Sequence, residues 1–266
     1  MKVEVLVATV NCTDIKKLIK KMNIQTDAII ANQCDHIGYE EIKYNNSSIK
    51  VYSFPERGVG LNRNNALMRA SGDIVLFADD DEALVDKYEK KIINEFKTNK
   101  KADMLVFGVD SVGGTRNACH IKKSTRVHKY NSLKYGAVRF ALKLDAIRKN
   151  NICFSLLFGG GARYGSGEDS IFIYDCLNNK MKVYTSPVII GTVDFSDSSW
   201  FNGYNEKYYF DKGALFYSLH KKFALLFSLI YLLRHRNEQS SLTFNQKLSL
   251  LKKGINHING SDKYEK

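Results

Sequence analysis

Three consecutive aspartates, Asp79, Asp80 and Asp81, follow directly on an apolar run at residues 74–78. Such a run is typical of a strand buried on both faces, which carries the residues after it to the rim of a sheet. Because side chains alternate along a strand, Asp79 and Asp81 share one side, where two carboxylates about 4 Å apart repel by about 4 kcal/mol at an effective dielectric of about 20. A divalent cation would remove this repulsion, and oxygen ligands favour Mg²⁺ or Mn²⁺ held together with substrate phosphates. The triplet therefore predicts a metal-bridged nucleoside diphosphate, although a solvated turn would also explain it.

A second acidic pair, Glu168 and Asp169, follows a glycine-rich loop at residues 158–167 and opens a helix predicted over residues 170–177. The positive end of a helix dipole favours negative charge in the first turn, so the pair has a structural explanation as well as a catalytic one. The residues alone leave both explanations open.

A segment rich in glycine, arginine and asparagine lies upstream of the triplet, at residues 56–67. Gly58 allows a sharp backbone turn beside a ligand, and a short helix is predicted behind it, over residues 64–70. The planar guanidinium of Arg63 can grip phosphate oxygens with two hydrogen bonds, which would place it next to a diphosphate or a sugar. A structural ion pair with Asp73 or Asp79 explains Arg63 equally well.

The glycine segment with Arg63-Asn64, the short helix, the strand and the D-x-D of residues 79–81 together resemble the family 2 glycosyltransferases of GT-A fold. The resemblance is particularly to bacterial enzymes of capsule and exopolysaccharide assembly, and it extends from the first predicted strand through Glu168-Asp169. It implies inverting, Mg²⁺- or Mn²⁺-dependent transfer of a sugar from a UDP- or dTDP-type nucleotide diphosphate sugar to a hydroxyl of a saccharide acceptor. The pathway implied is surface polysaccharide biosynthesis, in which the acceptor is expected to be linked to a polyprenyl pyrophosphate.

The same resemblance implies roles for the acidic residues. Asp169 would be the general base for the acceptor hydroxyl, with Glu168 beside it. Asp81 would be a direct metal ligand, Asp79 a ligand of the metal or the ribose, and Asp80 a further contact to the nucleotide sugar.

Other contacts to the nucleotide sugar are implied by position in the family pattern, at Thr9, Asn11, Asn32, Gln33, Gly58, Arg63 and Asn64. Asn32 and Gln33 stand where the family usually has acidic residues, so amides would read the base there. Turn and capping roles would also explain these polar residues.

On the acceptor side we expect Gly167 and Trp200, the only tryptophan of the chain, whose ring would stack on a sugar. Packing in a core or an interface is an alternative use of a lone tryptophan. The histidine that the family often has on a later strand is missing, so either Asp194 substitutes for it or that role is absent.

Repeated strand, helix and strand units predict a parallel sheet with right-handed crossovers. We expect strands at residues 3–8, 27–31, 49–54, 74–78, 104–109, 138–142 and 188–194, and helices at 13–22, 64–70, 82–98, 144–149 and 170–177. Thr13 is the expected cap of the first helix. With the resemblance, residues 1–210 form a GT-A domain, an α/β fold with a mostly parallel sheet flanked by helices. Residues 211–266 are then a basic and apolar helical appendage.

The composition of the chain indicates which partners it could bind and in which compartment it is expected. The chain of 266 residues has a net charge of +12, which suits nucleotide diphosphates, polyprenyl pyrophosphates or anionic lipids, and no nucleic-acid module is recognisable. Its five cysteines include no C-x-x-C pair, so neither a zinc site nor a disulfide framework is indicated. The N-terminus runs directly into a predicted strand rather than a secretory signal, and the expected location is the cytoplasm.

The apolar run at residues 223–233 stands between Lys221-Lys222 and a basic trio at residues 234–236. As a helix it would be about 16 Å long, too short to cross a bilayer. It is either a buried helix or one that lies in a membrane interface with its basic ends on anionic lipid. Residues 207–266 hold 11 lysines and arginines against four acidic residues, which favours the inner face of the plasma membrane.

Two other classes of function remain as alternatives. A sugar-phosphate nucleotidyltransferase shares the architecture but needs a longer glycine-rich, basic loop after the first strand, where this chain has residues 9–12, Thr-Val-Asn-Cys. A non-enzymatic basic module that binds a membrane surface would explain the charge and the tail. It would leave both acidic clusters without a role.

Overall fold

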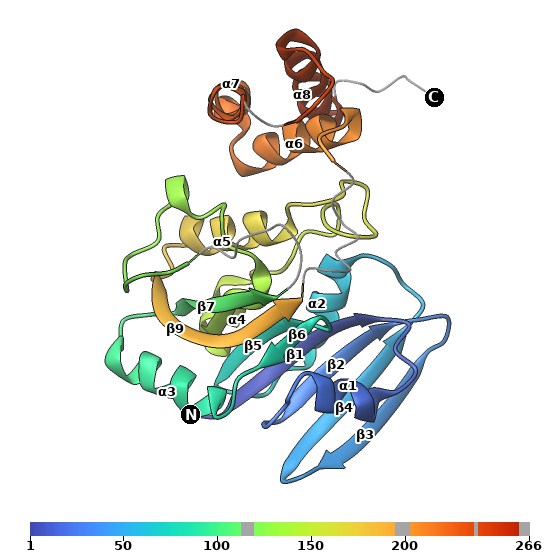
Figure 1. Ribbon diagram of the computed structural model, residues 1–266, viewed down its shortest axis with the longest axis vertical. Coiled ribbons are helices and arrows are strands. Elements are labelled where there is room, and N and C mark those ends of the chain that lie inside the picture. Colours follow the sequence, from blue (N-terminus) through green and yellow to red (C-terminus); the bar gives the residue numbers. More distant parts are fainter. Residues whose placement is uncertain (113–119, 195–202, 237–238, 261–266) are drawn as a thin grey trace.

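The computed structural model describes residues 1–112, 120–194, 203–236 and 239–260. Within these residues one mixed, mostly parallel sheet has the strand order β3-β4-β2-β1-β5-β8-β7-β9-β6 (Figure 1). Four neighbouring strands at its centre run parallel, namely β4 (Ser47–Phe54), β2 (Ala28–Gln33), β1 (Val3–Val10) and β5 (Ile74–Asp79). Parallel strands of this kind bring their carboxyl ends to one edge, where open α/β sheets bind ligands.

The register shows which residues meet at that edge. Thr9 of β1 lies opposite Asn32 of β2, and Ala8 lies opposite Asp79 at the end of β5. The loop after β1 and the acidic triplet after β5 therefore emerge side by side.

The outer strands are partly antiparallel. β3 (Gly38–Tyr44) pairs with β4, and β8 (Phe140–Lys143) lies antiparallel between β5 and β7 (Met104–Val112). β9 (Val183–Asp194) runs parallel to β7 and also pairs with β6 (Glu82–Leu84).

Alternating side chains divide the core of the sheet into two layers. Val5 and Val7 face α1 (Ile15–Lys21) and α3 (Tyr88–Thr98), whereas Leu6 faces the opposite layer. That second layer contains α2 (Val59–Arg69), α4 (Leu144–Asn150) and α5 (Glu168–Asn178). Short 3₁₀ turns lie at Lys129–Asn131, Ala137–Arg139 and Lys221–Phe223.

Two local expectations were wrong. Residues 82–84 were expected to begin a helix, but they form β6 against β9, and the helix starts only at Tyr88. The reason is burial, because Glu82 and Leu84 point into the core while the backbone pairs with a strand about 110 positions later. The first helix is capped by Asp14, whose side chain accepts from the Lys17 N–H, rather than by Thr13.

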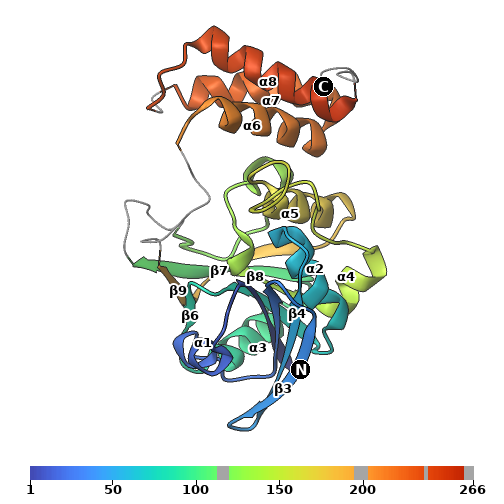
Figure 2. The ribbon, with the colours of Figure 1, turned by 90° about the vertical axis from the view of Figure 1, so that its right-hand side faces the viewer.

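The C-terminal helices α6 (Glu206–Leu219), α7 (Ala224–Arg234) and α8 (Phe244–Asn259) form a layer of their own beyond α5 (Figures 1 and 2). This layer has a separate apolar core, to which α5 and the loop before it contribute Ile171 and Tyr164. The expected domain boundary between residues 210 and 211 falls inside α6, which begins at Glu206.

Glycines allow α6 and α8 to cross in backbone contact. A Cβ placed on Gly254 of α8 would overlap the backbone oxygen of Phe210, and one on Gly213 of α6 would overlap the backbone oxygen of Leu251. Each glycine therefore fits against the backbone of the facing helix.

Replacing Gly254 with alanine is expected to destabilise the protein by about 1–3 kcal/mol, because the added methyl group forces the helices apart. An exposed Gly→Ala change inside a helix normally stabilises by up to about 1 kcal/mol, so the sign of the effect is diagnostic. Urea unfolding would measure it, with Ser249→Ala on the exposed side of α8 as the control. A Gly254→Ala protein that is as stable as the wild type would contradict the close crossing.

Candidate active site

Arg63 joins the two acidic clusters that the sequence separates by about 90 residues. Its Nη2 donates to both carboxylate oxygens of Asp79 at 2.9 Å, and its Nη1 donates to Oε1 of Glu168 at 2.8 Å. The guanidinium is supplied by α2, Asp79 by the end of β5 and Glu168 by the start of α5. The Arg63 side chain thus brings the acid at the end of β5 and the acid that follows the glycine-rich loop into one site.

The Arg63 side chain is only 6% exposed, and the two carboxylates decide its charge. Burial disfavours the charged guanidinium, but the charges of Asp79 and Glu168 outweigh burial and raise the pKa of Arg63. The structural ion pair with Asp79 that the sequence left open is therefore present. Glu168 is a second partner that spacing along the chain gave no means of finding.

Asp169 lies beside this cluster in the first turn of α5 and is partly buried. Its Oδ1 accepts a hydrogen bond of 2.7 Å from the Ser170 N–H. Burial and then the negative charge of Glu168 raise the pKa of Asp169 to about 7, against the opposing effect of Arg63. A carboxylate with a pKa near neutrality can accept a proton and release it again, as a general base must.

The three aspartates of the triplet have different surroundings. Asp79 is held by Arg63, and Oδ2 of Asp80 accepts from Oγ1 of Thr9 at 2.5 Å. Oδ1 of Asp81, in contrast, is buried and has no hydrogen-bond partner within the described part of the chain. Burial, followed by the charges of Asp79 and Asp80, raises the pKa of Asp81 to about 6. A buried carboxylate oxygen that has no hydrogen-bond partner and lies near other negative charges is suited to binding a cation.

Two further acidic residues adjoin Asp81. Glu82 is fully buried, and neither of its carboxylate oxygens has a hydrogen-bond partner among the described residues. Burial, and then the charges of Asp79 and Asp81, raise the pKa of Glu82 well above its usual range. Asp194, at the end of β9, is exposed and donates its backbone N–H to the Asp81 carbonyl at 3.2 Å. Glu82 was missed because residue 82 was expected to begin a helix.

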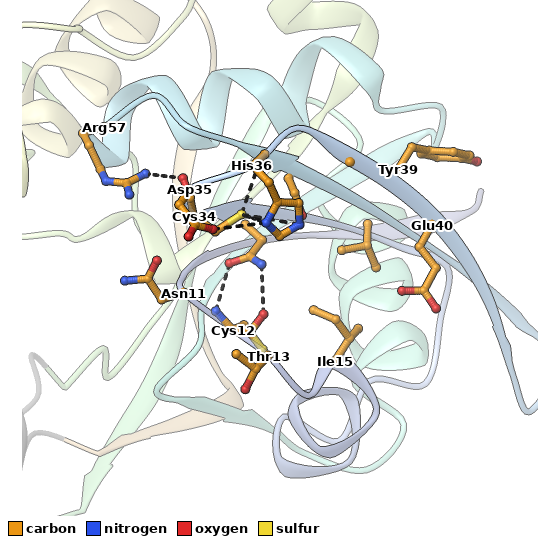
Figure 3. Close-up of a pocket in the computed structure, with 14 residues that line it drawn as sticks. Asn11, Cys12, Thr13, Ile15, Cys34, Asp35, His36, Tyr39, Glu40 and Arg57 are labelled. Carbon is orange, nitrogen blue, oxygen red and sulfur yellow. Dashed lines mark hydrogen bonds and ion pairs between the residues drawn. The ribbon is translucent and has the colours of Figure 1, made fainter.

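A pocket of about 910 Å³ opens at the ends of β1, β2 and β4. Figure 3 shows Asn11, Cys12 and Thr13 on one side of it and Cys34–His36 on the other. Tyr39 also lines it, from β3. This residue was missed because an edge strand so rich in polar residues gave no strand pattern.

Cys34, Asp35 and His36 offer ligand atoms within 4.8 Å of one another, so they are a second group that could hold a metal ion. The Asp35 side chain is 95% exposed, however, and water can solvate it without an ion. The buried oxygen of Asp81 is the stronger candidate.

The predicted amide contacts are engaged with the protein itself. The side chain of Asn32 bonds the Cys12 N–H and carbonyl at 3.0 Å, and Nε2 of Gln33 donates to the Gly58 carbonyl at 2.9 Å. The side chain of Asn64 bonds the backbone of Phe154 in the same two-sided manner. These amides hold the loops around the site in place, and Asn32 also lines the pocket.

The glycines of the site allow close approaches. Gly58 precedes α2 with a φ of 120°, and Gly161 of the glycine-rich loop packs against its backbone. Gly167, expected on the acceptor side, precedes α5 with a φ of 121°, and a Cβ there would lie 2.8 Å from a methyl group of Leu215 in α6. Gly167 is thus a contact to the C-terminal helices. Trp200 lies outside the described residues.

Comparisons with known proteins agree with this architecture. Residues 25–155 match the model of the family described as Glycosyl transferase family 2. Crystal structures of S. aureus TarS 1-349 with UDP-GlcNAc and with UDP both have a TM-score of 0.63, at 17% and 16% identity. They cover 98% and 97% of this chain and 73% and 83% of their own. A further S. aureus TarS structure has a TM-score of 0.58 at 18% identity, over 98% of this chain and 44% of that one.

At these identities the likeness to TarS shows the fold, and it confirms the expected GT-A-like α/β class. No curated protein matches the chain.

Proposed function

Because the chain belongs to glycosyl transferase family 2, we propose that it transfers a sugar from a UDP- or dTDP-type nucleotide diphosphate sugar to a hydroxyl of a saccharide acceptor. The observation that carries the proposal is the junction of Arg63, Asp79 and Glu168, which sets Asp169 beside the acidic triplet. Donor binding and acceptor activation then share one site. The pathway we propose is surface polysaccharide assembly.

In the proposed reaction Asp169 takes the proton of the acceptor hydroxyl as that oxygen bonds to the anomeric carbon. The bond between this carbon and the diphosphate oxygen breaks at the same time, and the nucleoside diphosphate leaves with the electron pair. A single displacement of this kind inverts the anomeric centre. Burial, and then the charge of Glu168, keep the pKa of Asp169 high enough for it to act as a base, and Arg63 holds Glu168 in position.

We propose Asp81 and Asp79 as the residues that would hold Mg²⁺ or Mn²⁺, with Asp194 near by. Enzymes of this fold typically depend on a metal, and the buried orphaned oxygen of Asp81 supports its choice. Such an ion would stabilise the charge that develops on the departing diphosphate. Asp80 and Thr9, which are hydrogen-bonded to each other, would border the nucleotide.

We assign the nucleoside to the pocket of about 910 Å³, where Asn11, Asn32 and Tyr39 contribute polar and aromatic surface. Its position at the carboxyl ends of parallel strands supports this assignment. The TarS structure with UDP-GlcNAc shares the fold, and it provides the precedent for a nucleotide sugar.

A panel of UDP- and dTDP-sugars incubated with Mg²⁺ or Mn²⁺ tests the proposal through slow hydrolysis, detected as released nucleoside diphosphate. We expect one donor to be hydrolysed, EDTA to stop the release, and Asp81→Asn to lower it by at least about a hundredfold. Asp145→Asn, an exposed acid on α4, is the matched control. If no nucleotide binds with either metal, or if Asp81→Asn binds and hydrolyses like the wild type, the proposal is wrong.

A further inference from the structure

One face of α7 is covered and the opposite face is not. Ala224, Ser228 and Leu232, spaced four residues apart, are buried against α6 and α8. The other side, together with Phe223 of the 3₁₀ turn that precedes α7, presents five large apolar side chains that are between 38% and 66% exposed: Phe223, Leu225, Leu226, Ile230 and Leu233. We call these five the outer face of α7.

The outer face is the reverse of what a solvated helix shows. A helix packed on one side normally turns charged and polar residues to water on the other. Contiguous exposed apolar side chains instead mark a surface that contacts a partner. Tyr231 does not extend the outer face, because its hydroxyl bonds that of Tyr208 in α6 at 2.9 Å.

Positive charge stands at both ends of the outer face. Lys221 and Lys222 precede α7, Arg234 ends it and Arg236 follows it, all exposed. Residues 220–236 contain no aspartate or glutamate. Lysine or arginine close to an anionic lipid surface contributes about 1 kcal/mol each, so these four side chains would add to the insertion of the apolar ones.

The basic residues at the two ends of α7 also indicate which partner could cover its outer face. A second copy of the chain stacked through the same face would bring two acid-free basic clusters together, and their repulsion opposes a dimer. Among the described residues no helix is both long and apolar enough to cross a bilayer. A short helix with an apolar front and basic ends fits the plane of a lipid interface.

We propose that the outer face of α7 inserts into the interface of an anionic lipid bilayer, with the helix axis parallel to the surface. The three C-terminal helices lie at one end of the molecule, whereas β3 and α1, which border the pocket, lie at the other end in both views (Figures 1 and 2). The pocket therefore stays on the aqueous side of a docked molecule. If the proposed function holds, a lipid-linked saccharide acceptor would reach the same surface.

Sedimentation with vesicles of equimolar phosphatidylcholine and phosphatidylglycerol, without nucleotide, tests the docking surface. We expect the wild type to bind these vesicles, to bind pure phosphatidylcholine weakly, and to be released at a salt concentration of about 1 M, where the Debye length is about 3 Å. Leu226→Glu with Leu233→Glu should weaken binding by at least about a hundredfold, since each buried leucine contributes about 1.5 kcal/mol or more.

Met68→Glu is the matched control, because Met68 is an equally exposed apolar residue on α2. Circular dichroism establishes that each variant is folded. Undiminished vesicle binding by the double variant overturns the proposal, and so does binding that is equal with and without phosphatidylglycerol. A wild type that is dimeric in sedimentation velocity, with a monomeric double variant, would show that a second copy covers this face instead. Since vesicle binding needs no donor, its failure is separate from a failure of the proposed function.

Discussion

Replacing Asp169 with asparagine is expected to lower kcat by about a hundredfold to ten-thousandfold, the usual contribution of a general base. Binding of the nucleoside diphosphate should be retained, because the Arg63 bridge from Asp79 to Glu168 does not use the Asp169 side chain. Single-turnover kinetics with a chosen acceptor would measure kcat. Calorimetric titration with the nucleoside diphosphate would measure binding.

The pH dependence of Asp169 has a definite sign. A base must be ionised to act, and the pKa of Asp169 is raised to about 7. The wild-type rate should therefore fall about tenfold for each pH unit below that value and level off above it. In Asp169→Asn this fall in rate at low pH, the acid limb of the pH profile, should be absent.

The same shift predicts a gain in stability. Because the folded-state pKa of Asp169 lies above its unfolded value, its stabilising contribution is present at acid pH and lost as the pH rises through about 7. Asp169→Asn, which stays neutral, should therefore have a higher Tm than the wild type at pH 8. Low activity with higher stability would separate a catalytic role from damage to the fold.

Asp175→Asn is the control, because Asp175 is a partly buried acid on the same helix whose pKa burial also raises. We expect it to keep the wild-type rate and the acid limb. A similar loss of activity in both variants, or an acid limb that persists in Asp169→Asn, would assign the base to another residue.

The sequence predicted those parts of the site whose signal is local. The apolar run before Asp79 and the position of Glu168 after a glycine-rich loop are short patterns, and the structure brings both to one place. The central strands could be predicted for the same reason, because each is a buried run of consecutive residues.

What the sequence did not predict depends on partners far along the chain. Glu82 is in a strand because β9 lies beside it, and no property of residues 82–98 alone reveals that strand. Nor did the sequence reveal that Asn64, expected at the nucleotide sugar, bonds the backbone of Phe154, or that Gly167, expected on the acceptor side, faces Leu215, and both ligand contacts stay predictions. A polar or small residue near a site has the same local appearance whether it binds a ligand or supports a loop.

Replacing Arg63 with methionine is expected to destabilise the protein by about 3–5 kcal/mol, the cost of removing one partner from a buried ion pair. The change leaves Asp79 and Glu168 close together without a cation, and the Glu168 side chain is only 11% exposed. Urea unfolding at pH 8 would measure the loss. Nucleotide hydrolysis should fall as well, because Asp169 would no longer be held beside the triplet.

The contributions of charge and of packing to stability can be separated by also neutralising Asp79 and Glu168. Adding Asp79→Asn and Glu168→Gln to Arg63→Met leaves no buried charge, so the triple variant should recover much of the lost stability while remaining inactive. Arg69→Met is the control, since Arg69 lies on the same helix but is exposed and stacks on Tyr52 and Phe54. Equal losses in Arg63→Met and Arg69→Met, or no recovery in the triple variant, would mean that Arg63 acts through packing alone. The bridge between the two acidic clusters would then not be what assembles the site.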